Sequence, residues 1–266
     1  MRTQRLKTIE HTDPLRMKAT AHLTGFRFVD RVLIDVAEKA AEKAHFACEL
    51  FGFGRKQFST LDIMFGKTRL GVVGGITKKR ELTLGWRFFL STGAYRDQTL
   101  IHEFAHIVVG IDTWWTRTGT FLVNTDTTDF LRGIVQEGLS EFAAMRYYQE
   151  THTDVETKTR VWHIMKTVGI IALTLPIEVT TSLLRLMQKV RNQAPLYDVY
   201  SRGLRLAEAV YDAVGDEKEV CRIMTHCPPK TISMALNPHE YLEHLVTMGR
   251  LRIADDGFYV KGLEYL

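Results

Sequence analysis

The sequence predicts an α+β fold, because the period of its apolar residues changes twice along the chain. Apolar side chains recur at three- and four-residue steps over residues 28–51, which is typical of an amphipathic helix. Over residues 57–92 the apolar runs are short, β-rich and separated by glycine and lysine. From residue 129 onward the helical period dominates. We therefore expect a polar N-terminal arm over 1–27, an N-terminal subdomain over 28–128, and a mainly helical C-terminal subdomain over 129–266.

Composition agrees with an ordinary globular protein. The 266 residues are 45% hydrophobic and 25% charged, and 35 lysines and arginines against 31 acidic residues give a net charge of +4. Three cysteines without a C-x-x-C pair argue against a disulfide scaffold and favour a reducing compartment. No apolar segment reaches the ~20 residues of a membrane span, and no signal peptide is seen. We expect a cytoplasmic protein, with secretion by another route left open. The basic turn Lys78-Lys79-Arg80 lacks interleaved aromatics, so no nucleic-acid partner is expected.

Each element of the N-terminal part has a local signal. Residues 1–27 are polar and of mixed charge, and we expect them to be loosely held. The helix over 28–51 stops at Gly52, since glycine commonly ends helices. A helix over 97–109 is predicted with Asp97 as its N-cap. Between these helices, three strands of one small sheet are predicted in the runs QFSTLDIMF, RLGVVGG and ELTLGWRFFL.

The C-terminal part is predicted to be helical after one long loop. Residues 111–128 are rich in Thr, Asp and Gly, which is typical of a long loop or a hairpin. The tail RIADDGFYVKG indicates a hairpin around its Asp-Asp-Gly turn. The helices expected between them are Phe130–Glu150, Glu156–Thr174, Glu178–Asn192, Tyr200–Val214, Glu217–Thr225 and Pro238–Met248.

The sequence His102-Glu103-Phe104-Ala105-His106 lies on the predicted helix over 97–109. Helical residues four apart point to the same side, so the imidazoles of His102 and His106 can bind one metal ion. Glu103 stands beside that ion, where it can take a proton from a metal-bound water. The alternative is two surface histidines on an ordinary helix. The capped, apolar helix directly after a strand-rich region favours the metal site.

A catalytic zinc ion needs a third protein ligand. Glu137 and Glu141 lie four residues apart on the predicted helix over 130–150, so both face one side. Glu137 can complete a His-His-Glu set. Glu141 can accept the free ring N–H of a ligand histidine, with His102 favoured. The alternative is that both glutamates lie on a solvated face of the helix. The apolar residues around the pair argue against this alternative.

The motif HEFAH followed by EGLSE resembles the gluzincin branch of zinc metallopeptidases, over roughly residues 28–225 in order of elements. The resemblance implies a zincin-like fold and one Zn²⁺ per chain, held by His102, His106 and Glu137. It also implies that Glu103 is the general base and acid and that Glu141 supports a ligand histidine.

The same resemblance extends to an oxyanion donor. Tyr200-Ser201-Arg202-Gly203, opening a predicted helix, is similar to the Tyr-x-Lys-Gly of gluzincin aminopeptidases, whose tyrosine hydroxyl stabilises the developing oxyanion. The resemblance implies this role for Tyr200. Tyr197 and Arg202 are neighbours that could substitute, and Arg202 is also a candidate for substrate binding. A core tyrosine whose hydroxyl reaches solvent is the alternative for Tyr200.

Two departures from that pattern shape the expected specificity. Thirty residues separate His106 from Glu137, more than in thermolysin-like or membrane-alanyl-type enzymes, and the extra length holds Trp114 and Trp115. These tryptophans either line the substrate cleft or pin the loop to the core. The aminopeptidases carry G-x-M-E-N on an upstream strand, whereas this chain has Gly-Gly-Ile-Thr-Lys over 74–78, without a carboxylate. Endopeptidase activity is therefore favoured over aminopeptidase activity.

The function that the sequence predicts is zinc-dependent hydrolysis of peptide bonds in a peptide or protein substrate. One alternative is a catalytically inactive scaffold or binding module on the same fold. Another is a zinc hydrolase of a non-peptide amide or ester, since the same site geometry serves either chemistry. Metal analysis together with an activity screen distinguishes the peptidase from the inactive scaffold or binding module. Substrate profiling distinguishes it from a hydrolase of a non-peptide amide or ester.

Overall fold

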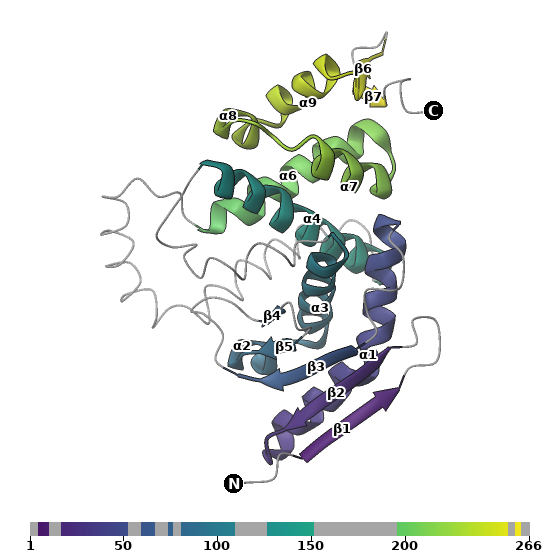
Figure 1. The fold of residues 1–266 in the computed structure, drawn as a ribbon, viewed down its shortest axis with the longest axis vertical. Coiled ribbons are helices and arrows are strands. Elements are labelled where there is room, and N and C mark those ends of the chain that lie inside the picture. Colours follow the sequence, from purple (N-terminus) through teal and green to yellow (C-terminus); the bar gives the residue numbers. More distant parts are fainter. Residues whose placement is uncertain are drawn as a thin grey trace, which may run out of the picture.

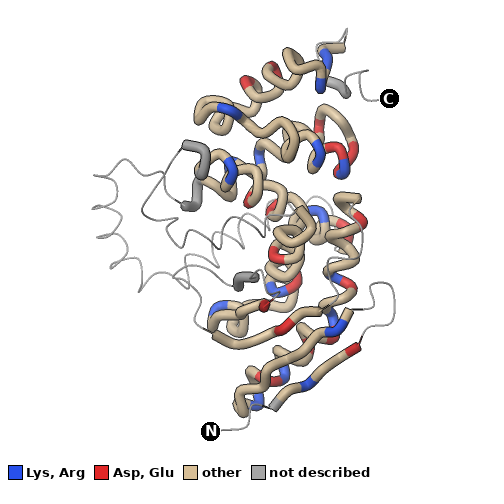
Figure 2. Tube along the Cα trace, viewed as in Figure 1, with Lys and Arg blue, Asp and Glu red and all other residues tan. Residues whose placement is uncertain are grey.

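A computed structural model describes residues 5–10, 17–52, 60–66, 74–76, 81–109, 127–151, 196–254 and 259–261. Within these ranges the chain has a five-stranded sheet and a helical layer beside it, followed by further helices and a two-stranded hairpin (Figure 1). The predicted α+β class is confirmed. Lys and Arg are interspersed with Asp and Glu in both halves (Figure 2). No helix among the described residues combines the length and the apolar character that crossing a membrane requires.

The larger sheet has the strand order β1-β2-β3-β5-β4. β2 pairs in parallel with β3, and β3 with β5, while β1 and β4 run antiparallel at the two edges. Helix α1 packs against β2 and β3. The strands are β1 (Arg5–Glu10), β2 (Lys18–Leu23), β3 (Thr60–Phe65), β4 (Gly74–Ile76) and β5 (Glu81–Leu84).

Two sequence predictions about this sheet are wrong. The expected loose arm contains β1 and β2, and β2 buries the small side chains of Ala19 and Ala21, which give little apolar signal. The run ELTLGWRFFL is not one strand, because β5 ends at Leu84 and helix α2 occupies Trp86–Leu90. Phe88 and Phe89 are both buried, which suits neighbouring helical residues better than the opposite faces of a strand.

The two helices of the N-terminal half begin and end through local chemistry. Helix α1 (Arg27–Phe51) ends at Gly52, whose φ of 71° is the left-handed conformation that glycine adopts freely. Helix α3 (Gly93–Val108) is capped by Thr92, whose hydroxyl accepts from the Tyr95 N–H. Asp97 is therefore not the predicted N-cap. It lies one turn inside the helix, where its carboxylate is 3.4 Å from the Lys43 ammonium.

The helical half is largely as predicted where the structure describes it. Helices α4, α6, α7 and α9 and the hairpin of β6 with β7 match expected elements, whereas the short α8 is not among them. The loop over 111–126, with Trp114 and Trp115, and the helices predicted over 156–174 and 178–192 lie outside the described residues. The bounds are α4 Thr127–Thr151, α6 Leu196–Val214, α7 Glu217–His226, α8 Ile232–Leu236, α9 Pro238–Thr247, β6 Leu251–Ile253 and β7 Tyr259–Lys261.

Helix α3 packs against both α1 and α4, and α4 packs against α6 (Figure 1). The α4–α6 contact is unusually close, because a glycine on each helix meets the other. A Cβ atom on Gly138 would lie 2.4 Å from the backbone of Gly203, and one on Gly203 would lie 2.2 Å from the Ile134 carbonyl oxygen. Only hydrogen fits at either position, so this glycine pair sets how near α6 comes to the residues on α4.

Candidate metal centre

Helix α3 brings the two motif histidines together. The Nε2 atoms of His102 and His106 are 3.0 Å apart, and the ring centroids are separated by 4.7 Å. This is the arrangement that a four-residue step on one helix predicts. The side chains are only 13% and 15% exposed, so the pair is not an ordinary surface feature.

Helix α4 supplies the carboxylate that the sequence predicts as the third ligand. Glu137 Oε2 lies 3.1 Å from His102 Nε2 and 3.5 Å from His106 Nε2. One ligand atom from each of the three residues lies within 4.8 Å of the others. The carboxylate therefore converges on the same point as the two imidazoles, although it comes from a different helix.

The donors at this point fit a divalent cation. Glu137 Oε2 is buried and accepts no hydrogen bond of good geometry, although both imidazoles are within ion-pair distance. A buried carboxylate oxygen normally has a hydrogen-bond partner or a metal ion. Two imidazole nitrogens and one carboxylate oxygen form the donor set of several catalytic zinc sites. The same donors accept other divalent ions, so the arrangement does not identify the metal.

The opposite ring nitrogens of both histidines contact α4. His102 Nδ1 lies 3.6 Å from Glu141 Oε1, so the structure brings together the pair that the sequence predicts. His106 Nδ1 lies 3.1 Å from the hydroxyl oxygen of Ser140. Sequence reasoning missed Ser140, because serine is common and the pairing depends on how α3 and α4 are aligned. Its position one turn after Glu137 is the signal that could have found it.

The cluster is strongly coupled electrostatically. Burial acts to lower the pKa of His102, but the contact with Glu137 and the charges of Glu141 and Glu103 outweigh it and raise the pKa to about 9. Burial acts to raise the pKa of Glu137, but the neighbouring His106 and His102 hold that pKa well below its usual range. Without a metal ion, the protonated ring of His102 thus offsets the negative charge of Glu137. A divalent ion bound here would take over that role and displace the proton.

Glu103 follows the first histidine on α3 and is only 8% exposed. Its charge contributes to the raised pKa values of both His102 and Tyr200, which shows that the carboxylate acts on the same small region. The predicted general base is therefore a buried carboxylate whose charge acts on His102 and Tyr200.

Tyr200 reaches this region from α6. Its ring stacks on the His102 ring, with centroids 5.9 Å apart and an interplanar angle of 30°. The charge of Glu137, followed by burial and the charge of Glu141, raises the pKa of Tyr200 well above its usual value, so the hydroxyl keeps its proton. Tyr200 does not open its helix as predicted, because α6 begins at Leu196.

Tyr95 is a second tyrosine near the cluster, and sequence reasoning missed it. It lies on α3 seven residues before His102, a spacing of two helical turns that was available as a signal. Burial first, and then the charge of Glu141, raises the pKa of Tyr95. Tyr197, the alternative to Tyr200, is in the first turn of α6, where the side chains lie outside the described part.

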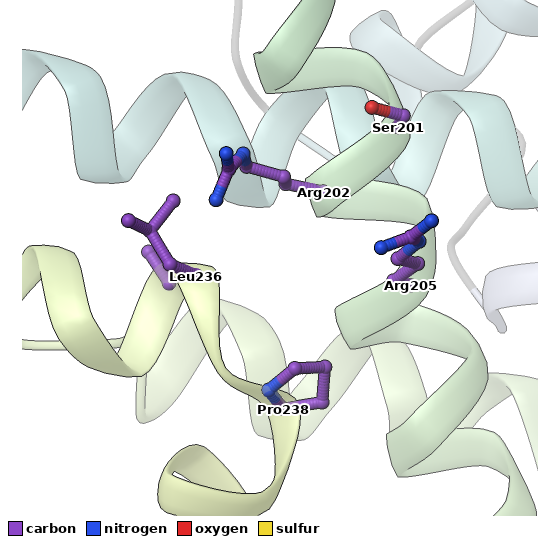
Figure 3. A pocket seen from close by; sticks show the side chains of 6 residues that line it. Ser201, Arg202, Arg205, Leu236 and Pro238 are labelled. Atoms are coloured by element: carbon purple, nitrogen blue, oxygen red, sulfur yellow. The ribbon is translucent and has the colours of Figure 1, made fainter. Parts of the chain in front are cut away.

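Arg202 lines a cavity between the first half of α6 and the segment from α8 to the start of α9. The cavity measures about 170 Å³, and Arg202 extends toward Leu236 from α8 in Figure 3. Arg205 and Pro238 line other parts of it. The structure thus places the predicted substrate-binding arginine against α8 and the start of α9, two residues along α6 from Tyr200.

Comparison of the chain with protein-family models, with curated proteins and with solved structures gave no match. The structure by itself shows an α+β chain in which His102, His106 and Glu137 form a group with donors suited to a metal ion.

Proposed function

We propose that the protein is a metal-dependent hydrolase in which His102, His106 and Glu137 hold one divalent ion, Zn²⁺ being the expected one. The observation that carries the proposal is the convergence of these three ligand atoms within 4.8 Å. A bound ion would supply Lewis acidity, which lowers the pKa of a water molecule and polarises a carbonyl group.

The residues around the ligands fit the remaining tasks of amide hydrolysis. The buried carboxylate of Glu103 would accept a proton from the attacking water and return it to the leaving amine. The protonated hydroxyl of Tyr200, held against His102, would donate a hydrogen bond to the developing oxyanion. The contact between Gly138 and Gly203 brings α6 close enough to α4 for this tyrosine to reach the cluster.

A peptide is the proposed substrate, and the likeness to gluzincins supports this choice. The order of elements after the first two strands supports it: a long helix, the remaining strands of a small mixed sheet, the helix with both histidines, and the helix with the glutamate. A zincin-like fold is part of the proposal. Cleavage within a peptide chain is favoured over removal of its first residue, because residues 74–78 contain no carboxylate to bind a substrate amine.

The Glu103→Gln variant tests this function. The amide keeps the size of the side chain but removes the base, so we expect hydrolysis of an internally quenched peptide library to fall by roughly 100- to 10,000-fold while one equivalent of metal stays bound. Glu150→Gln, on an exposed position of α4, is the matched control and should hydrolyse as wild type does.

The same library assay with and without chelator separates this proposal from its alternatives. A zinc-loaded Glu103→Gln protein that cleaves as well as wild type would refute the assigned base. A wild-type protein that binds metal but cleaves no peptide would favour a binding module, or a hydrolase of another amide or ester.

A further inference from the structure

One turn of α4 contacts all the imidazole nitrogens of the candidate metal centre. Glu137 faces the Nε2 atoms of both histidines, Glu141 lies near Nδ1 of His102, and Ser140 lies 3.1 Å from Nδ1 of His106. Ser140 has no exposed surface. The hydroxyl is therefore shielded from bulk water by the surrounding side chains.

The geometry also indicates which ring nitrogen of His106 would carry the proton when a metal ion is bound. The Nε2 atoms of the two histidines point at each other and at Glu137, so they are the atoms that offer lone pairs to an ion. A neutral imidazole with a free lone pair on Nε2 has its hydrogen on Nδ1. That N–H would point at the oxygen of Ser140, which lies 3.1 Å away and can accept it.

The two histidines have different partners, and the difference has an electrostatic reason. His102 faces a carboxylate, whereas His106 faces a neutral hydroxyl. Three carboxylates, from Glu103, Glu137 and Glu141, already act on this region. A neutral acceptor for His106 fixes the ring without adding a fourth negative charge, which would be costly to bury.

We propose that Ser140 is a positioning residue of the metal centre: its hydroxyl oxygen accepts the Nδ1–H of His106 and so keeps the Nε2 lone pair aimed at the ion. The inference rests on the proposed metal site and extends it to a residue that does not touch the ion. The competing explanation is that Ser140 only fills space, with its hydroxyl bonded back to a carbonyl of its own helix.

Binding of Zn²⁺ to metal-free wild type, Ser140→Ala and Ser233→Ala separates these explanations. Removal of a partner of this kind typically weakens metal binding by ~10–100-fold, and we expect Ser140→Ala to fall in that range. Ser233→Ala, an exposed serine on α8, should bind as wild type does. Because alanine is a strong helix former, both metal-free variants should unfold at temperatures close to that of metal-free wild type.

A ring N–H signal gives a readout that mere space filling would not move. In the zinc-loaded protein with ¹⁵N-labelled histidine, we expect slowly exchanging Nδ1–H resonances for both His102 and His106. Ser140→Ala should accelerate exchange at His106 and leave His102 unchanged. Glu141→Gln is the reciprocal variant and should affect His102 alone.

The outcomes distinguish this inference from the proposed function. Ser140→Ala with wild-type zinc affinity and an unchanged His106 signal would overturn the role of Ser140 while leaving the metal site in place. Wild type that binds neither Zn²⁺ nor Co²⁺ would overturn the metal site and the role of Ser140 together.

Discussion

The helices α3 and α4 carry two buried polar clusters, and the two differ in where the positive charge comes from. In the first, Lys43 of α1 is 2% exposed, bonds the Tyr147 hydroxyl of α4 and lies 3.4 Å from Asp97 of α3. The chain itself supplies the cation there. In the second, carboxylates outnumber the imidazoles, and a buried oxygen of Glu137 lacks a well-formed hydrogen bond.

This difference separates a structural cluster from a site that suits a ligand. The Lys43 cluster ties α1, α3 and α4 together, and carboxylates of this chain, those of Asp97 and Glu42, pair with its ammonium. In the cluster around Glu137, a protonated imidazole offsets only part of the negative charge, and a bound divalent ion would take the place of that proton. Variants in the first cluster should therefore change stability, and variants in the second should change chemistry.

A pair of tyrosine variants tests this division most strongly. Tyr200→Phe removes the proposed oxyanion donor, so we expect kcat to fall by roughly 100- to 1,000-fold with metal content unchanged. Tyr147→Phe removes the hydroxyl that bonds Lys43 and should leave kcat at the wild-type value. Equal losses of kcat in the two variants would contradict the division.

Substitution of Gly138, at the close contact between α4 and α6, should cause a large loss of stability. Gly138→Ala places a Cβ 2.4 Å from the Gly203 backbone, which cannot yield without moving α6, and the free energy of unfolding should fall by about 3 kcal/mol. Gly93→Ala, at the open start of α3, is the control and should be neutral or slightly stabilising. Urea unfolding measures both, and a Gly138→Ala protein as stable as wild type would show that α6 is free to move away.

Removal of the internal cation should cost stability without affecting the metal. Lys43→Met keeps most of the apolar stem but leaves Asp97 and the Tyr147 hydroxyl without their partner, so we expect the free energy of unfolding to fall by about 2 kcal/mol. Lys39→Met, which removes an exposed pair with Asp35, should change it by less than ~0.5 kcal/mol. Zinc affinity should match wild type in both variants. A loss of zinc affinity in Lys43→Met alone would show that the two clusters are energetically coupled.

The smallest expected effect is a pH dependence confined to alkaline solution. Burial acts to lower the pKa of Lys43, but the bonds to Tyr147 and Glu42 and the charge of Asp97 outweigh it and raise the pKa above 10.5. A group whose pKa rises on folding stabilises the fold fully below its unfolded pKa, and that contribution is lost as the pH rises through the folded pKa. The stability difference between wild type and Lys43→Met should thus be constant below pH 10 and shrink above pH 10.5. A stability difference that grows with pH would show that folding lowers the pKa of Lys43, which contradicts this assignment.

The sequence was sufficient where function depends on spacing along one helix. The four-residue steps from His102 to His106 and from Glu137 to Glu141 each place two side chains on one face, and the structure brings both faces together. Ser140 and Tyr95 were missed because their relevance depends on how two helices are aligned. The Gly138–Gly203 contact was missed for the same reason, since glycine within a helix gives no signal of what it touches.

The N-terminal strands show a different limit. β2 buries alanines among polar residues, and its stability comes from pairing with β1 and β3, which lie before and after it in the chain. The local pattern alone therefore predicts a loose arm. In ELTLGWRFFL, the change from strand to helix occurs at Gly85, which the run of apolar residues hides.

The most direct test is the zinc content of chelator-stripped protein after reloading, measured in wild type and in His106→Ala. The convergence of three ligands predicts about one tightly held equivalent per wild-type chain and none retained after His106→Ala is passed through a desalting column. Wild type that retains no zinc, or His106→Ala that retains as much as wild type, would contradict it.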